Sequence, residues 1–171
     1  MNPSLPKRFS ALIFGLSVLS MHAWAAPRAV ETFDSKTWPQ LQAELKRPAV
    51  AVFTTTDCVH CPAVIDSLTR GMRQRRLKAD LTVVVMDQAP GDNDAALLSN
   101  KHYRQVDRLF AFAGQAPALR YAVDPRWRGA TPYVVFMAPK TPALAVTGPP
   151  SAADFDAWVQ TSSGHAGEAR R

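Results

Sequence analysis

The chain has 171 residues, 47 % of them hydrophobic, and its 20 Lys and Arg against 14 Asp and Glu give a formal net charge of +6. This length suits one domain with its own core and is short for two. Much of the basic excess lies between Arg70 and Lys78, in the expected last turns of a helix, where cations complement the helix dipole. The charge therefore predicts a solvated helix end, and it argues against a nucleic-acid partner or a phospholipid patch.

The first 25 residues have the three parts of a secretory signal peptide. Lys7 and Arg8 precede an apolar run that ends near Met21, and small residues around Ala25 follow. The run is shorter than the roughly 20 residues that a membrane-spanning helix needs. We expect cleavage after about Ala25, a periplasmic mature protein and no stable membrane insertion after cleavage; a retained N-terminal anchor is the alternative.

The mature chain is expected to form one domain over residues 26–162, followed by a flexible tail over 163–171. Its first half alternates short apolar runs with segments whose apolar residues recur at spacings of three and four. The runs predict buried strands, and the spaced residues predict amphipathic helices. The expected elements are strands at 29–33, 49–53 and 81–86, a helix that begins near Pro39, and a helix that begins near Pro62.

Residues 87–130 are long for a single crossover and are expected to be helical. Asp92 to Asp94 can cap a short helix over 95–98, and this role is favoured over a calcium loop because further ligands are lacking. An apolar stripe then stops at Gly114, which predicts a second helix. The stripe consists of Tyr103, Val106, Phe110 and Ala113.

The last part of the chain predicts a hairpin and a closing helix. Strands are expected at 133–137 and 143–147, and Ser151 with Asp154 resembles a capping box. Phe155, Trp158 and Val159 then supply the face that packs on the sheet. The order of elements predicts an α/β fold with a central mixed sheet, helices on both faces, and a helical insertion between the central strands.

The chain has two cysteines, Cys58 and Cys61, and an exported protein occupies a compartment where disulfides form. A disulfide that closes a loop of about four residues is a weak staple, worth about 2 kcal/mol on the chain-entropy model. Both cysteines lie where a buried strand gives way to a helix. The pair is therefore better explained by chemistry than by stabilisation.

The run from Cys58 to Pro62, with Thr131 and Pro132 directly before a late strand, resembles the active site of the thioredoxin superfamily. The insertion of about 44 residues between central strands is similar to that of the periplasmic TlpA-like members. The resemblance implies a thioredoxin-like fold, a thiol:disulfide oxidoreductase without a cofactor or metal, and exchange with protein thiols or disulfides. It also implies a membrane redox partner, a cis Pro132, and a substrate-binding role for Thr131 and Pro132.

The two cysteines are expected to have different roles. A helix N-terminus stabilises a thiolate at Cys58, which makes Cys58 the nucleophile. Cys61, one turn further along, can then attack the mixed disulfide and release the partner. Val59 and His60 are expected to tune this pair; a His at this position resembles DsbA-type oxidases, in which the imidazole favours the thiolate and makes the disulfide more oxidising.

One position departs from the thioredoxin pattern. Thioredoxin has a buried acid six residues before its first cysteine, and the matching residue here is Val52. General-base assistance by that acid is therefore absent, and Asp57 is not expected to replace it because it should be exposed.

Two other functions are compatible with the sequence. A CxxC pair can bind zinc or copper(I), with His60 between the thiols, although His102 and His165 are isolated from the pair. The chain could also be a non-catalytic binding module that keeps the fold. Metal analysis of the reduced protein, and the activity of a variant without cysteines, separate these functions from an oxidoreductase.

Overall fold

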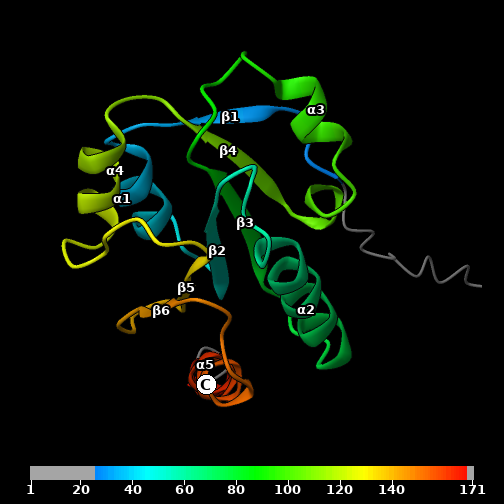
Figure 1. Cartoon of the computed structure of the whole chain (residues 1–171). Helices are drawn as coiled ribbons and strands as arrows, with labels where there is room; N and C mark the ends of the chain where they lie inside the picture. The colour runs from blue at the N-terminus through cyan, green and yellow to red at the C-terminus, as the bar shows by residue number, and fades with distance from the viewer. Residues whose placement is uncertain (1–25, 169–171) are drawn as a thin grey trace, which may run out of the picture.

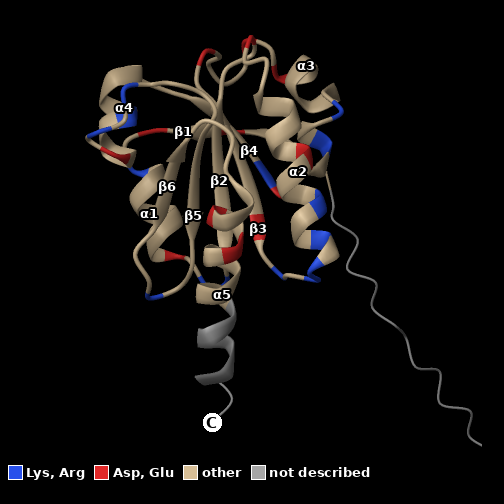
Figure 2. Ribbon diagram, turned by 60° about the horizontal axis from the view of Figure 1, so that its bottom comes forward, with Lys and Arg blue, Asp and Glu red and all other residues tan. Residues whose placement is uncertain are grey.

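The computed structural model describes residues 26–168 of the chain (Figure 1). The signal peptide predicted at 1–25 lies outside the described residues, as do the last three residues of the predicted tail. The fold is α/β, with one sheet between two layers of helices (Figures 1 and 2). Among the described residues, no helix combines the length and the apolar character that crossing a bilayer requires.

The sheet has six strands in the order β1-β4-β3-β2-β5-β6. The first four in this order are parallel to one another, whereas β5 is antiparallel to both β2 and β6, so the sheet is mixed as predicted. The strands are β1 (Val30–Phe33), β2 (Ala49–Thr54), β3 (Asp80–Val85), β4 (Arg108–Phe112), β5 (Tyr133–Met137) and β6 (Leu144–Thr147).

The helices cover both faces of the sheet. Alternate residues of β2 point to opposite faces: Val50 and Val52 contact the layer that contains α2 and α5, whereas Ala51 and Phe53 contact the layer that contains α1 and α4. The helices are α1 (Thr37–Ala43), α2 (Cys61–Gln74), α3 (Asp94–Ser99), α4 (Ala116–Val123) and α5 (Ala152–Glu168), with a 3₁₀ turn η1 (Tyr103–Gln105).

The sequence prediction of a helix over residues 103–113 is wrong. The segment instead forms η1 and then β4, which lies between β1 and β3. Leu109 packs in the α2 layer and Phe110 in the α1 layer, so β4 is apolar on both faces. A strand buried on both faces has apolar residues at most positions, and some of these also fall at helical spacing. The insertion is helical only in α3, η1 and α4, and it adds a strand to the sheet.

The close of the domain agrees with the sequence. The Asp154 carboxylate accepts hydrogen bonds from the Ser151 amide, at 2.8 Å, and from the Ser151 hydroxyl, at 2.6 Å, and the Asp154 amide donates to that hydroxyl, which is the predicted capping box. Phe155 and Trp158 are buried against Phe136 of β5. The helix itself runs to Glu168, past residue 163, where the predicted tail begins.

Helices α2 and α5 approach closely at Gly71. A Cβ atom there would lie 3.0 Å from the Phe155 ring, so the glycine leaves room for that ring. Arg75, just after α2, lies over the same ring at 4.8 Å and pairs with Asp156 of α5. Figure 2 shows further basic residues along α2, in line with the predicted solvated helix end.

Trp158 anchors α5 to the sheet, since its Nε1 donates to the Met137 carbonyl at 2.9 Å and its side chain is buried. Trp158→Ala should lower the free energy of unfolding by about 3–5 kcal/mol, because a large buried side chain is lost. Urea denaturation measures the change. The control is Tyr121→Ala, at a residue 66 % exposed, for which a change within about 0.5 kcal/mol is expected.

The capping box also predicts a pH dependence. The Ser151 hydroxyl and amide lower the pKa of Asp154, so this carboxylate stabilises the fold above the unfolded value of about 3.9 and ceases to do so as the pH falls through the lower folded pKa. The difference in unfolding free energy between the wild type and Asp154→Ala should therefore shrink as the pH is lowered from about 6 to about 2. A difference that stays constant over this range would contradict the role of the ionised group.

Candidate active site

Both cysteines lie where β2 ends and α2 begins. β2 is buried along its whole length, and the chain leaves the sheet after Thr54. The turn that follows is closed by a hydrogen bond from the Cys58 amide to the Thr55 carbonyl at 3.2 Å. Cys61 is the first residue of α2, and Pro62 fits the first turn because the amides there have no helical partners.

Cys58 and Cys61 form a disulfide, with their Cα atoms 5.5 Å apart. The two residues differ in exposure: Cys61 is 1 % exposed, whereas Cys58 is half-buried. Cys61 is covered because it belongs to the helix, whose Val64, Ile65 and Leu68 pack under the sheet. A partner that approaches the pair therefore meets Cys58 first.

Val59 and His60, between the cysteines, are both exposed, and Val59 is 85 % exposed although it is apolar. His60 precedes α2, and its carbonyl accepts the Val64 amide at 3.2 Å. Its side chain borders a hollow of about 160 Å³, whose other wall includes Pro149 and Pro150 before α5.

Thr131 and Pro132 lie at the same end of the sheet as the cysteines. Tyr133 pairs with Phe53 in the antiparallel ladder, so Pro132 comes opposite Thr54, the last residue of β2. The Thr131–Pro132 peptide bond is cis. The Pro132 carbonyl accepts the Gly148 amide at 2.8 Å, which ties this loop to the end of β6.

Sequence reasoning missed Asp87, which fastens the turn from the neighbouring strand. Asp87 follows β3, and its carboxylate accepts hydrogen bonds from the Thr56 amide at 3.0 Å and from the Thr56 hydroxyl at 2.5 Å. Tyr103 of η1 lies beside Thr54, and burial raises its pKa. The sequence did contain a signal for this contact, namely an acidic residue shortly after a predicted buried strand. Because the C-terminal ends of adjacent parallel strands lie side by side, Asp87 after β3 can reach the turn after β2.

Val52, in place of the thioredoxin acid, is fully buried and belongs to the same apolar cluster as Val64 and Leu68 of α2. Asp57 is exposed, as expected. The described side chains beneath Cys61 are therefore apolar at the position where thioredoxin has a proton acceptor.

The histidines weighed as metal ligands have other surroundings. The Nδ1 atom of His102 lies 3.0 Å from the Asp66 carboxylate, which also accepts a hydrogen bond from the side-chain Nε2 of Gln105. The side chain of His165 lies outside the described part of the chain. Over residues 26–162, no group of three or more His, Cys, Asp or Glu side chains is arranged to hold a metal ion.

No protein-family model matches the chain, and no curated protein sequence does. Among solved structures, it is similar to the thioredoxin domain of a thiol-disulfide oxidoreductase from Bacteroides vulgatus, with a TM-score of 0.52, 11 % identity, and coverage of 84 % of this chain and 99 % of that one. A secreted Mycobacterium tuberculosis disulfide oxidoreductase homologous to Escherichia coli DsbE aligns with a TM-score of 0.48 and 18 % identity, over 72 % of this chain and 85 % of that one.

A putative thioredoxin from Neisseria meningitidis aligns with a TM-score of 0.48 and 13 % identity, over 69 % of this chain and 75 % of that one. The Bacteroides domain matches the mixed sheet with helices on both faces over most of both chains. The fold of this chain is therefore the thioredoxin-like fold.

Proposed function

We propose that the chain is an exported thiol:disulfide oxidoreductase that exchanges disulfides with protein thiols through its Cys58-Val59-His60-Cys61 site. The observation that carries this proposal is the Cys58–Cys61 disulfide at the start of α2, with Cys58 half-buried and Cys61 covered. The thioredoxin-like fold and the position of Thr131–Pro132 at the same end of the sheet support it.

The reaction is a two-step exchange in which Cys58 reacts first. In the reduced protein, the Cys58 thiolate attacks one sulfur of a partner disulfide; that bond breaks, and the other partner sulfur leaves and takes up a proton. Cys61 then loses its proton and attacks the Cys58 sulfur, which forms the internal disulfide and releases the second partner thiol. Two electrons pass from the dithiol to the partner, and the reverse sequence oxidises a partner dithiol.

The start of α2 favours the Cys58 thiolate, because its unpaired amides place partial positive charge there. His60, when protonated, adds a positive charge beside the pair. Both effects stabilise the reduced form, so we propose a disulfide more oxidising than that of thioredoxin. Because Val52 leaves Cys61 without a buried base, we propose that the chain reduces partner disulfides more slowly than thioredoxin does.

The remaining assignments rest on the sequence. We propose that residues 1–25 are a cleaved signal peptide, that 26–162 form the domain, and that 163–171 form a tail. Export places the protein in the periplasm. The likeness to TlpA-like proteins supports a membrane redox partner, and the loop of Thr131 and Pro132 is proposed to receive the substrate backbone.

The assignment of the two cysteines is testable by trapping. Cys61→Ala should accumulate covalent mixed disulfides through Cys58, because attack is retained and release is lost. Cys58→Ala should accumulate few, since Cys61 is covered. Non-reducing electrophoresis after acid quenching and alkylation measures both variants. Equal trapping by the two variants would contradict the assignment, more trapping by Cys58→Ala would reverse it, and no trapping by either would refute the proposed function.

The role of His60 can be tested by measuring the reduction potential of the Cys58–Cys61 pair. His60→Pro should make the pair more reducing, because a positive charge near the thiolate is lost; a change of 1.4 kcal/mol corresponds to about 30 mV for this two-electron couple. Equilibration with glutathione buffers and alkylation gives the value. Val59→Ala, at an exposed uncharged neighbour, serves as the matched control and should shift the potential less. A wild-type potential at or below that of thioredoxin would contradict the proposed tuning.

A further inference from the structure

The outer edge of β6 carries backbone groups that pair with nothing else in the described part of the chain. The Gly148 amide bonds to Pro132 across the β5–β6 ladder. In an antiparallel ladder, every second residue bonds to the partner strand, so Val146 and Leu144 also face β5. The amides and carbonyls of Ala145 and Thr147 therefore point outward.

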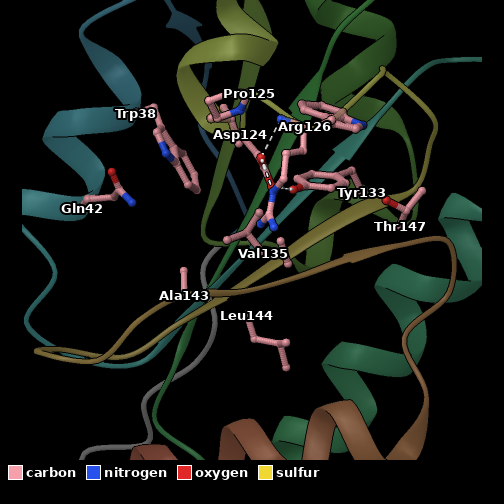
Figure 3. Close-up of a pocket in the computed structure, with 13 residues that line it drawn as sticks. Trp38, Gln42, Asp124, Pro125, Arg126, Tyr133, Val135, Ala143, Leu144 and Thr147 are labelled. Carbon is pink, nitrogen blue, oxygen red and sulfur yellow. Dashed lines mark hydrogen bonds and ion pairs between the residues drawn. The ribbon is translucent and has the colours of Figure 1, made fainter.

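A groove of about 640 Å³ lies beside this edge (Figure 3). Trp38 of α1 stands on one side and Ala143 and Leu144 on the other, and Tyr133 and Val135 of β5 contribute to the lining. The groove lies on the face of the sheet that α1 and α4 cover, where β5 is buried and most of β6 is exposed.

The wall beside Tyr133 is fixed in place. The Tyr133 hydroxyl donates to Asp124 at 2.8 Å, and its ring stacks on Trp127 at 4.3 Å. The carboxylate of Asp124 also accepts the Arg126 amide at 2.8 Å. The aromatic residues of the groove are themselves buried, so they form its rigid floor. The exposed lining is mixed, with polar Gln42, Arg126 and Thr147 beside apolar residues of β6 and the loop before it, and it lies directly next to the unpaired strand groups.

The edge leads to the cysteines. After Thr147 the chain passes through Gly148, which is bonded to Pro132, to Pro149 and Pro150, which line the hollow beside His60. At about 3.3 Å per residue, Ala145 lies at most about 17 Å from Pro150, because the chain bends at Gly148, where φ is +88°. A segment of about six to eight residues can therefore reach from the groove to the active site.

The free edge is short, which bears on what it can bind. Pro142 precedes β6, and Pro149 and Pro150 follow it, so the pairing length is close to the four residues of the strand. A sheet continued between two copies through so short an edge would bury far less than the roughly 1,200 Å² of a stable interface. A single extended segment matches this edge better, because it gains backbone bonds here and side-chain contacts in the groove.

We propose that β6 and the groove beside it bind an extended segment of the substrate polypeptide, with one of its side chains in the groove, while a cysteine of that segment reaches Cys58. This rests on the proposed oxidoreductase function and narrows its substrates to chains that are locally unfolded. Docking on β6 raises the local concentration of the substrate sulfur at Cys58, and the exchange itself proceeds as described above.

Two probes test the proposal with the reduced protein. Each is a peptide whose single cysteine is joined to glutathione by a disulfide: one is a tripeptide, and the other carries alternating Thr and Leu on both sides of the cysteine. The protein dithiol becomes the Cys58–Cys61 disulfide, and the peptide thiol and glutathione are released. The long peptide should react about tenfold faster than the tripeptide, as expected for a few added backbone bonds.

Ala145→Pro is the informative variant, because it removes an outward amide without removing a bond to β5. It should abolish the advantage of the long peptide and leave the tripeptide rate unchanged. Ala145→Gly keeps the amide and is the matched control, with the advantage retained. A long peptide methylated on its backbone nitrogens should also lose its advantage on the wild-type protein, which tests the edge without any change to the fold.

The outcomes separate the two proposals. If wild-type protein reacts with neither probe, the proposed function fails. If it reacts with both at similar rates, or if Ala145→Pro and N-methylation leave the advantage intact, the docking proposal fails and the oxidoreductase function stands. A contrary result in sedimentation equilibrium is a wild-type dimer that Ala145→Pro converts to a monomer. That result would mean that β6 pairs with a second copy of this chain, and it would overturn the docking proposal.

Discussion

The burial of β2 on both faces is the constraint on which the rest of the structure depends. Every residue of this strand is covered, by α2 and α5 on one side and by α1 and α4 on the other. The chain leaves the sheet at the C-terminal end of β2, and the turn with Cys58 begins there. The packing of α2 under the same strand then fixes Cys61 in the interior. The unequal exposure of the two cysteines thus follows from the layered core.

Sequence patterns predict the parts of the fold in which local and tertiary preferences agree. β2, α2 and the hairpin of β5 and β6 have continuous apolar runs or helical spacing, and all were predicted. β4 was not, because Tyr103, Val106, Phe110 and Ala113 have helical spacing while the sheet requires Leu109 and Phe110 on opposite faces. That requirement arises from β1 and β3, which the local sequence does not specify.

The site shows the same division. A CxxC pair before a helix is a short-range pattern, and it identified Cys58 and Cys61. The hydrogen bonds from Thr56 to Asp87 join residues 31 apart in the sequence, and they depend on the pairing of β2 with β3. The outward backbone amide and carbonyl of Ala145 could not be predicted from the sequence, since they follow from the register of β6 against β5 and not from any side chain.

Gly71 couples the helix layer to the active-site end of the molecule. Because it has no side chain, the Phe155 ring can lie against α2, and this contact sets how near α5 stands to that helix. α5 is preceded directly by Ser151 and by Pro149 and Pro150, which border the hollow at His60. A Cβ atom at position 71 would require the Phe155 ring, near the start of α5, to give way by a few tenths of an ångström. The absence of a side chain at Gly71 therefore bears on the width of the hollow at His60, although the two lie near opposite ends of α2.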